Sequence, residues 1–208
     1  VMPYVTTPEL DHNKENPNPV LEFISICPVC GTKLVVSKSG KSAKCPNVKC
    51  KGRSIARMAN MMDKLGIKDF AEASVEKINK YHLTDIINMD AESLIDIIGE
   101  VNAHKFVERM NELKTKPIYD FEIIGALGFS GIAQETWKKI FSKVDMISLV
   151  TAYDNGTLEN ILSGIKGIGP MTRQTIIDEF DFFEYDIKYI IKMPNIKSSL
   201  GLKQKSIR

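Results

Sequence analysis

The 208-residue sequence lacks long hydrophobic runs, and charged residues interrupt each of its apolar stretches. Because a membrane-spanning helix needs about 20 consecutive apolar residues, we expect no membrane partner. A basic stretch followed by an apolar one, the mark of a secretion signal, is missing from its start. The composition, with 43% hydrophobic residues, supports one ordinary core or two small ones. These features predict a soluble protein of the cytoplasm.

Histidine is scarce, and His12, His82 and His104 are scattered along the chain. None stands in a pattern that pairs it with a nucleophile, so surface histidines are expected in place of a catalytic base. The single tryptophan, Trp137, is expected in the core rather than on a base-stacking surface, and so are Met58, Met61 and Met62.

Acidic residues are missing from two segments. Residues 27–58 contain eight Lys or Arg, and residues 187–208 contain six. The region between them, 59–186, has 13 basic and 22 acidic residues, a balance of −9. Basic segments favour an anionic polymer such as DNA as a partner, although a solvated basic surface remains the alternative.

All four cysteines fall into two short pairs, Cys27-Pro-Val-Cys30-Gly and Cys45-Pro-Asn-x-x-Cys50. Four thiolates form the closed tetrahedral shell that a structural Zn²⁺ prefers, and such a shell has no position for a reactive water. Two disulfides or four unrelated thiols are the alternatives, which an intracellular location and the paired spacing disfavour. The sequence therefore predicts a structural zinc module that depends on its metal for folding.

A fourfold repeat follows the cysteines. It aligns an apolar residue and a small one in each copy: Phe70-Ala71, Ile98-Gly99, Ile132-Ala133 and Ile168-Gly169. A small polar residue stands three positions after the small one: Ser74, Asn102, Thr136 and Thr172. A large apolar residue stands seven positions after it: Ile78, Phe106, Ile140 and Ile176. Each copy predicts a helix, a tight turn and a second helix.

The second helix of each copy would begin with backbone N–H groups that have no partner. Such a helix start binds anions through these donors and its dipole, so an acidic region can still hold DNA phosphates. A plain bundle of helical hairpins, in which the small residues only allow close packing, is the alternative. The fourth copy favours phosphate binding most, because Gly167 and Gly169 permit the turn and Pro170 suits a helix start.

Together, the cysteine pairs and the four helical hairpins resemble the C-terminal half of NAD-dependent DNA ligases over residues 27 to about 195. The resemblance implies a mostly α fold in which a small four-cysteine zinc module precedes a four-unit helix-hairpin-helix domain. The implied boundaries are a lead-in over 1–26, zinc module over 27–53, helix-hairpin-helix domain over 54–191 and basic tail over 192–208. The piece Met2-Pro3-Tyr4-Val5 looks like the last strand of an oligonucleotide-binding domain. Fraying is expected from Ser198 onward.

The hairpins depart from the family pattern to different degrees. The fourth keeps both glycines, while the third has Ala133 at the second glycine position. The second has Ile97 at the first glycine position, and Asp69 and Ala71 replace both glycines of the first. Arg173 occupies a position that usually holds a small residue. The resemblance implies the following DNA contacts: Gly99, Gly128, Gly131, Ala133, Gly167, Gly169, Met171 and Thr172. Lys38, Lys41 and Lys44 are also expected to contact phosphates, because no acidic residue lies among the basic residues of their segment; a solvated surface is the alternative.

The family's adenylation chemistry requires a Lys-x-Asp-Gly motif, which this sequence does not contain. NAD and Mg²⁺ are therefore expected to act only through a separate adenylating half, and the chain is expected to be inactive alone. The C-terminal phosphopeptide-type (BRCT) domain of bacterial members is also not expected. The chain would then be a ligase fragment or one subunit of a split enzyme, in a bacterial cell or a phage-infected host.

The predicted function is the clamping of nicked double-stranded DNA during phosphodiester bond formation in replication and repair. One alternative is a stand-alone DNA-binding adaptor for a repair enzyme, which would share the zinc and the hairpins. Another is a zinc-stabilised interaction protein without DNA affinity.

Overall fold

The structure, a computed structural model, describes residues 24–37, 40, 42–67 and 70–202. Contacts divide the chain into two compact units, Val1–Pro46 and Asn47–Arg208. The piece Met2-Pro3-Tyr4-Val5 lies outside the described residues.

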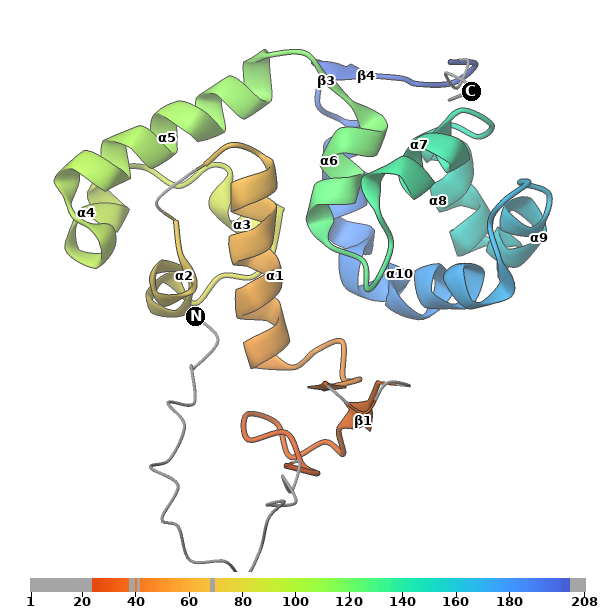
Figure 1. Cartoon of the computed structure of the whole chain (residues 1–208). Helices are drawn as coiled ribbons and strands as arrows, with labels where there is room; N and C mark the ends of the chain where they lie inside the picture. Colours follow the sequence, from red (N-terminus) through yellow and green to blue (C-terminus); the bar gives the residue numbers. More distant parts are fainter. Residues whose placement is uncertain (1–23, 38–39, 41, 68–69, 203–208) are drawn as a thin grey trace, which may run out of the picture. The chain divides into compact units, whose positions relative to one another are not determined.

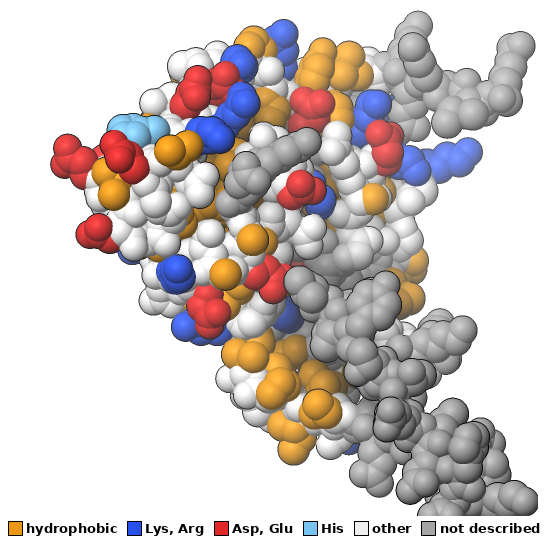
Figure 2. All heavy atoms as spheres, turned by 60° about the vertical axis from the view of Figure 1, so that its left-hand side comes forward, with side chains coloured by type: hydrophobic (Ala, Val, Ile, Leu, Met, Phe, Trp, Pro, Cys, Tyr) orange, Lys and Arg blue, Asp and Glu red, His pale blue; other side chains and the backbone are white. Residues whose placement is uncertain are grey.

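The first unit contains a small β-ribbon. Strands β1 (Val35–Val36) and β2 (Ala43–Lys44) pair antiparallel, with Val35 opposite Lys44. An isolated bridge joins Ile26 to Lys33. Five large apolar side chains of this unit are exposed: Ile24, Ile26, Val29, Val35 and Val36. Figure 2 shows hydrophobic side chains gathered on this part of the surface. A unit that exposes so much of its apolar surface gains little stability from a core.

The second unit is helical (Figure 1), as the sequence predicted. Its helices are α1 (Lys51–Lys64), α2 (Glu72–Ile78), α3 (Leu83–Ile86), α4 (Glu92–Ile98), α5 (Glu100–Thr115), α6 (Asp120–Leu127), α7 (Gln134–Phe141), α8 (Met146–Asp154), α9 (Leu158–Ser163) and α10 (Pro170–Ile191). Consecutive helices pack in the pairs α1/α2, α4/α5, α6/α7 and α9/α10, with α3 and α8 as connecting elements. The expected four helical pairs are therefore present.

Helix α1 shows how the hydrophobic pattern forms these elements. Met58, Met61 and Met62 lie on one face and are 0–3% exposed, so they are core residues as predicted. The helix begins at Lys51, three residues before the expected start of the helical domain at residue 54. The pattern reports only the buried face of a helix, and the first turn of α1 is polar.

The repeat contributes one buried residue of each copy to the core of the helical unit. The large apolar residue seven positions after the small one is buried in all four copies: Ile78, Phe106, Ile140 and Ile176. Trp137 is 0% exposed and stacks on Phe141 at a centroid distance of 5.6 Å, which confirms its predicted place in the core. The common spacing in the four copies therefore reflects the packing of one helix face per copy.

Residues beyond α10 return to the helical unit. Strand β4 (Ile196–Lys197) pairs parallel with β3 (Ile118–Tyr119). The backbone amide of Ser199 then donates to Oδ2 of the buried Asp120 at 2.9 Å. The expectation of fraying from Ser198 was therefore wrong for Ser199, because this carboxylate holds it in the interior.

Candidate metal centre and nucleic-acid interface

The four cysteines form one cluster. The Sγ atoms of Cys27, Cys30, Cys45 and Cys50 all lie within 4.8 Å of one another. The Sγ atoms of Cys30 and Cys45 are 3.5 Å apart, well beyond the roughly 2.0 Å of a disulfide bond. In a tetrahedral zinc site with Zn–S distances of about 2.3 Å, neighbouring sulfurs are separated by about 3.8 Å. The cluster therefore has the composition and the size to hold a metal ion.

Backbone turns place the first two sulfurs. The amide of Gly31 donates to the carbonyl of Cys27 at 2.9 Å, and the amide of Cys27 donates to the carbonyl of Thr32 at 2.8 Å. Gly31 has a φ of +71°, a backbone conformation that residues with a Cβ rarely adopt. Gly31 therefore turns the chain directly after Cys30.

The second cysteine pair joins the cluster to α1. The amide of Cys50 donates to the carbonyl of Asn47 at 3.2 Å, and the amide of Lys49 donates to the Asn47 side chain at 3.0 Å. Cys50 is the N-cap of α1, and its carbonyl accepts from the amide of Ser54 at 2.9 Å. A thiolate at this position would interact favourably with the helix dipole.

The small residue of each repeat copy is the N-cap of a helix. Ala71 caps α2, Gly99 caps α5, Ala133 caps α7 and Gly169 caps α10. All four N-cap residues are exposed, and none has a side chain that can satisfy the first N–H groups of its helix. Four helix starts of the kind expected to bind phosphates are thus present.

The third hairpin contains three of the predicted DNA contacts. Gly128 ends α6 in a left-handed conformation, and a Cβ there would lie 2.9 Å from Cγ of Arg57. Gly131 and Ala133 are exposed in the turn that leads into α7. Gly128 is therefore required by packing, whereas the other two present backbone to solvent.

A buried carboxylate holds this third turn. Oε2 of Glu179 accepts from the amide of Ser130 at 2.8 Å, and Oε1 accepts from Nη2 of Arg53 at 3.0 Å. Arg57 lies 4.0 Å from the same carboxylate and 4.6 Å from the ring centroid of Phe182. Burial lowers the pKa of Arg57 to about 10, while Glu179 counteracts this change. None of these long-range partners was predicted from the sequence.

The fourth hairpin presents an open helix start. Gly167 has a φ of +89°, whereas Gly169 has an ordinary extended conformation and open space around a Cβ. Met171 is 78% exposed, and Thr172 is half-buried in the first turn of α10. Nothing in the described structure requires glycine at position 169, so this position is free to be approached by a ligand.

Arg173, which departs from the family pattern, stabilises this fourth turn. Its Nη1 donates to the carbonyl of Ile168 at 2.9 Å, and its Nε donates to Glu159 of α9 at 2.8 Å. The larger side chain therefore connects the two helices of the hairpin and holds the loop between them.

The second hairpin differs from the others. Helix α4 continues through Ile97 to Ile98, and Gly99 alone separates it from α5. Gly99 has φ 83° and ψ 153°, a backbone conformation that is essentially restricted to glycine. In this copy, where Ile97 replaces the first glycine, no separate turn lies between the two helices, and Gly99 alone joins them.

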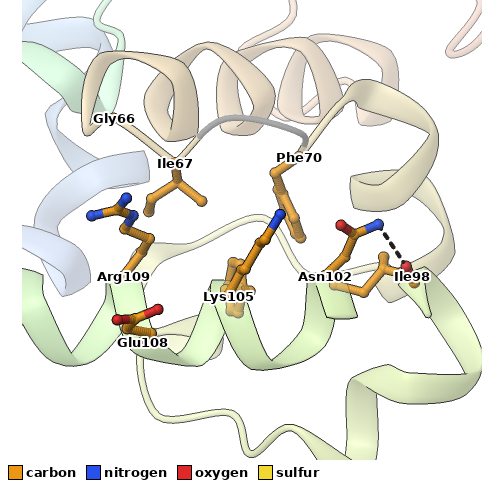
Figure 3. Close-up of a pocket in the computed structure, with 9 residues that line it drawn as sticks. Gly66, Ile67, Phe70, Ile98, Asn102, Lys105, Glu108 and Arg109 are labelled. Carbon is orange, nitrogen blue, oxygen red and sulfur yellow. Dashed lines mark hydrogen bonds between the residues drawn. The ribbon is translucent and has the colours of Figure 1, made fainter. Parts of the chain in front are cut away.

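The first and second copies face each other across a hollow of about 480 Å³. Figure 3 shows Ile67 and Phe70 on one side, with Lys105 and Arg109 of α5 opposite them. Glu108 also lines the hollow, and Arg109 donates to Glu112 at 2.7 Å. Its mixed charges make this hollow a poor site for an anionic polymer.

The remaining predicted contacts come from the first unit. Lys44 is exposed on β2. Lys38 and Lys41 lie outside the described residues, as does Asp69 of the first hairpin.

A histidine contact was also missed by sequence reasoning. Nδ1 of His82 lies 2.9 Å from Oδ2 of Asp186, and the other oxygen of this carboxylate accepts from the amide of Thr84 at 3.1 Å. The hydrogen bond with Asp186 raises the pKa of His82 against the lowering effect of burial. The partners are 104 residues apart, so no local motif marks them.

Among the described residues, no helix is both long enough and apolar enough to cross a membrane.

No protein-family profile matches the chain. The chain is similar to the DNA ligase of Sulfurihydrogenibium azorense, with 29% identity over 155 residues, 71% of this chain and 22% of that protein. It is 26% identical to the DNA ligase of Aquifex aeolicus over 189 residues, 87% of this chain and 25% of that ligase. The DNA ligase of Desulfatibacillum aliphaticivorans is 28% identical over 166 residues, 72% of this chain and 26% of that ligase.

The chain thus spans about a quarter of the length of the curated relatives it matches. The cysteine cluster and these similarities confirm the resemblance inferred from the motifs. The chain is therefore similar to a C-terminal part of bacterial DNA ligases.

Proposed function

We propose that this chain is the non-catalytic, DNA-binding part of an NAD-dependent DNA ligase in the cytoplasm. It clamps nicked double-stranded DNA while the adenylating half of the enzyme seals the nick, in replication and repair. The similarity to DNA ligases supports this assignment, and so does the absence of Lys-x-Asp-Gly from the sequence.

The observation that carries the proposal is the repeated helix start. Ala71, Gly99, Ala133 and Gly169 are exposed N-caps without a hydrogen-bonding side chain. Backbone N–H groups at such positions bind phosphates without reading bases, which suits a protein that must hold any nick. The fourth hairpin is the strongest candidate, because α10 is long and Gly169 is open.

The cysteine cluster would hold a structural Zn²⁺. Four thiolates complete its tetrahedral shell, so the metal supplies folding energy to the cysteine unit and no water for hydrolysis. NAD and Mg²⁺ act in the adenylating half. The exposed apolar side chains of the first unit are consistent with a surface that binds the adenylating half.

Nick sealing tests the proposal. The adenylating half is assayed with NAD and nicked duplex DNA, with and without this chain, and with its Gly169→Asp variant. We expect strong sealing only with the wild-type chain. An aspartate N-cap satisfies the first N–H groups of α10 and repels phosphate, while it leaves the helix intact.

Gly169→Ala is the matched control, because the open space accepts a methyl group and Ala133 has the equivalent position in the third hairpin. Sealing that is indifferent to the chain, with DNA binding retained, would favour the adaptor function. Equal DNA affinity of wild type and Gly169→Asp would refute the hairpin assignment.

A further inference from the structure

A hollow of about 510 Å³ lies beside the fourth hairpin, and none of its described lining residues belongs to α10. Its lining comes from three places along the chain: the end of α7, the hairpin turn before α10 and the segment after β4. The lining residues are Lys139, Ser142, Lys143, Ile165, Lys166, Gly201 and Leu202. Three of the seven are lysines, and none of the described lining residues is acidic.

The wall formed by the C-terminal segment is fixed in place. Ile196 pairs with β3, the Ser199 amide donates to Asp120, and the amide of Gly201 donates to the carbonyl of Ser142 at 3.1 Å. On the opposite side, Ile165 is 7% exposed and belongs to the core. Strand pairing, hydrogen bonds and the core therefore hold the walls of the hollow.

The lysines of this hollow differ from two other lysines, Lys138 of α7 and Lys188 of α10. Lys138 lies 3.9 Å from Glu135, and Lys188 contacts both Glu184 and Asp154. Both of these lysines thus have a carboxylate within 4.0 Å. The three lysines of the hollow instead collect positive charge at one place in a region whose sequence is acidic overall.

We propose that Lys139, Lys143 and Lys166 bind the sugar-phosphate backbone of duplex DNA, as a second contact beside the fourth hairpin. This inference rests on the proposed function, since Lys166 belongs to the same turn as Gly167 and Gly169. A strand held at the start of α10 would continue past this turn into the hollow. The ammonium groups act there as point charges on phosphates, which adds affinity without sequence preference.

The test is the salt dependence of binding to a nicked duplex, measured by fluorescence anisotropy with the zinc-loaded chain. Lys139→Ala/Lys143→Ala is compared with Lys138→Ala/Lys188→Ala, which removes the same charge at paired lysines. The slope of log affinity against log salt changes by about 0.9 for each phosphate that the protein no longer neutralises. We expect a slope that is shallower by up to about 1.8 for the first double variant and unchanged for the second, and a change of about 0.9 for Lys166→Ala in the fourth turn.

Three results would overturn the inference. Equal slopes for both double variants would show that only net charge matters. A lower melting temperature with an unchanged slope would show that these lysines merely stabilise the end of α7. Absence of DNA binding by the wild type would remove this site and the proposed function together, whereas binding weakened by Gly169→Asp with an unchanged lysine slope would refute this site alone.

Discussion

Glu179 of α10 accepts a hydrogen bond from the backbone amide of Ser130 at 2.8 Å, across 49 residues of sequence. The same carboxylate binds Arg53 at 3.0 Å and lies 4.0 Å from Arg57. Both arginines belong to α1, whose N-cap is the cluster residue Cys50. One carboxylate therefore connects the helix that follows the metal cluster to the turn of the third hairpin.

Removal of this carboxylate should destabilise the helical unit strongly. Glu179→Ala leaves Arg57, whose side chain is 7% exposed, without its compensating charge. Breaking a buried ion pair by removing one partner costs about 3–5 kcal/mol of unfolding free energy, and we expect a value near the lower limit because Arg53 is partly exposed. Urea unfolding measures the loss.

Glu135→Ala is the control for this experiment, because its pair with Lys138 is long and its own side chain is 74% exposed. Exposed pairs contribute little, so its midpoint should stay close to that of the wild type. Similar midpoints for Glu179→Ala and the control would contradict the connecting role of Glu179.

Particular residues show how much the sequence could predict. The helical pairs could be predicted from the spacing of the repeat. Its last apolar position is buried in every copy: Ile78, Phe106, Ile140 and Ile176. The cysteine cluster follows from short local pairs. Both kinds of information are local, and local periodicity records which face of an element is buried.

The remaining features depend on distant partners. Strands β3 and β4 have two residues each, too short for an alternating pattern, and 78 residues separate Ile118 from its partner Ile196. The bonds of Glu179 and Asp186 likewise join residues that no spacing relates. Such contacts arise only when helices pack, so a single sequence does not reveal them.

Metal removal should affect the two units differently. We expect one zinc ion per chain by elemental analysis, and loss of exchange protection at Gly31 and Leu34 after treatment with a chelator. The amides of α10 should keep their protection, because its core packing does not involve the cluster residues. Restoration by added Zn²⁺ is the control. Absence of metal from protein purified under reducing conditions without chelator would refute the site.

The stability contributed by His82 should depend on pH. Its pKa is raised above the ordinary value of 6.5, chiefly by the hydrogen bond with Asp186. A raised folded-state pKa gives stability that is fully present below the unfolded value and is lost as pH rises through the folded value. Wild type should therefore exceed His82→Gln in unfolding free energy more at pH 5.5 than at pH 8.5.

We expect this pH-dependent difference to be about 1 kcal/mol or less, because His82 is partly exposed to solvent. A difference that grows toward high pH would contradict the assigned direction.

The two glycines that begin long helices should respond oppositely to alanine. Gly99 has φ 83° and ψ 153°, so Gly99→Ala forces a Cβ into a conformation that costs about 1–3 kcal/mol. Gly169 has φ −74° and open space around a Cβ, so Gly169→Ala should be neutral or slightly stabilising because it restricts the unfolded chain. Thermal unfolding of both variants tests this difference. Equal loss of stability would show that glycine at position 169 serves the fold rather than a ligand.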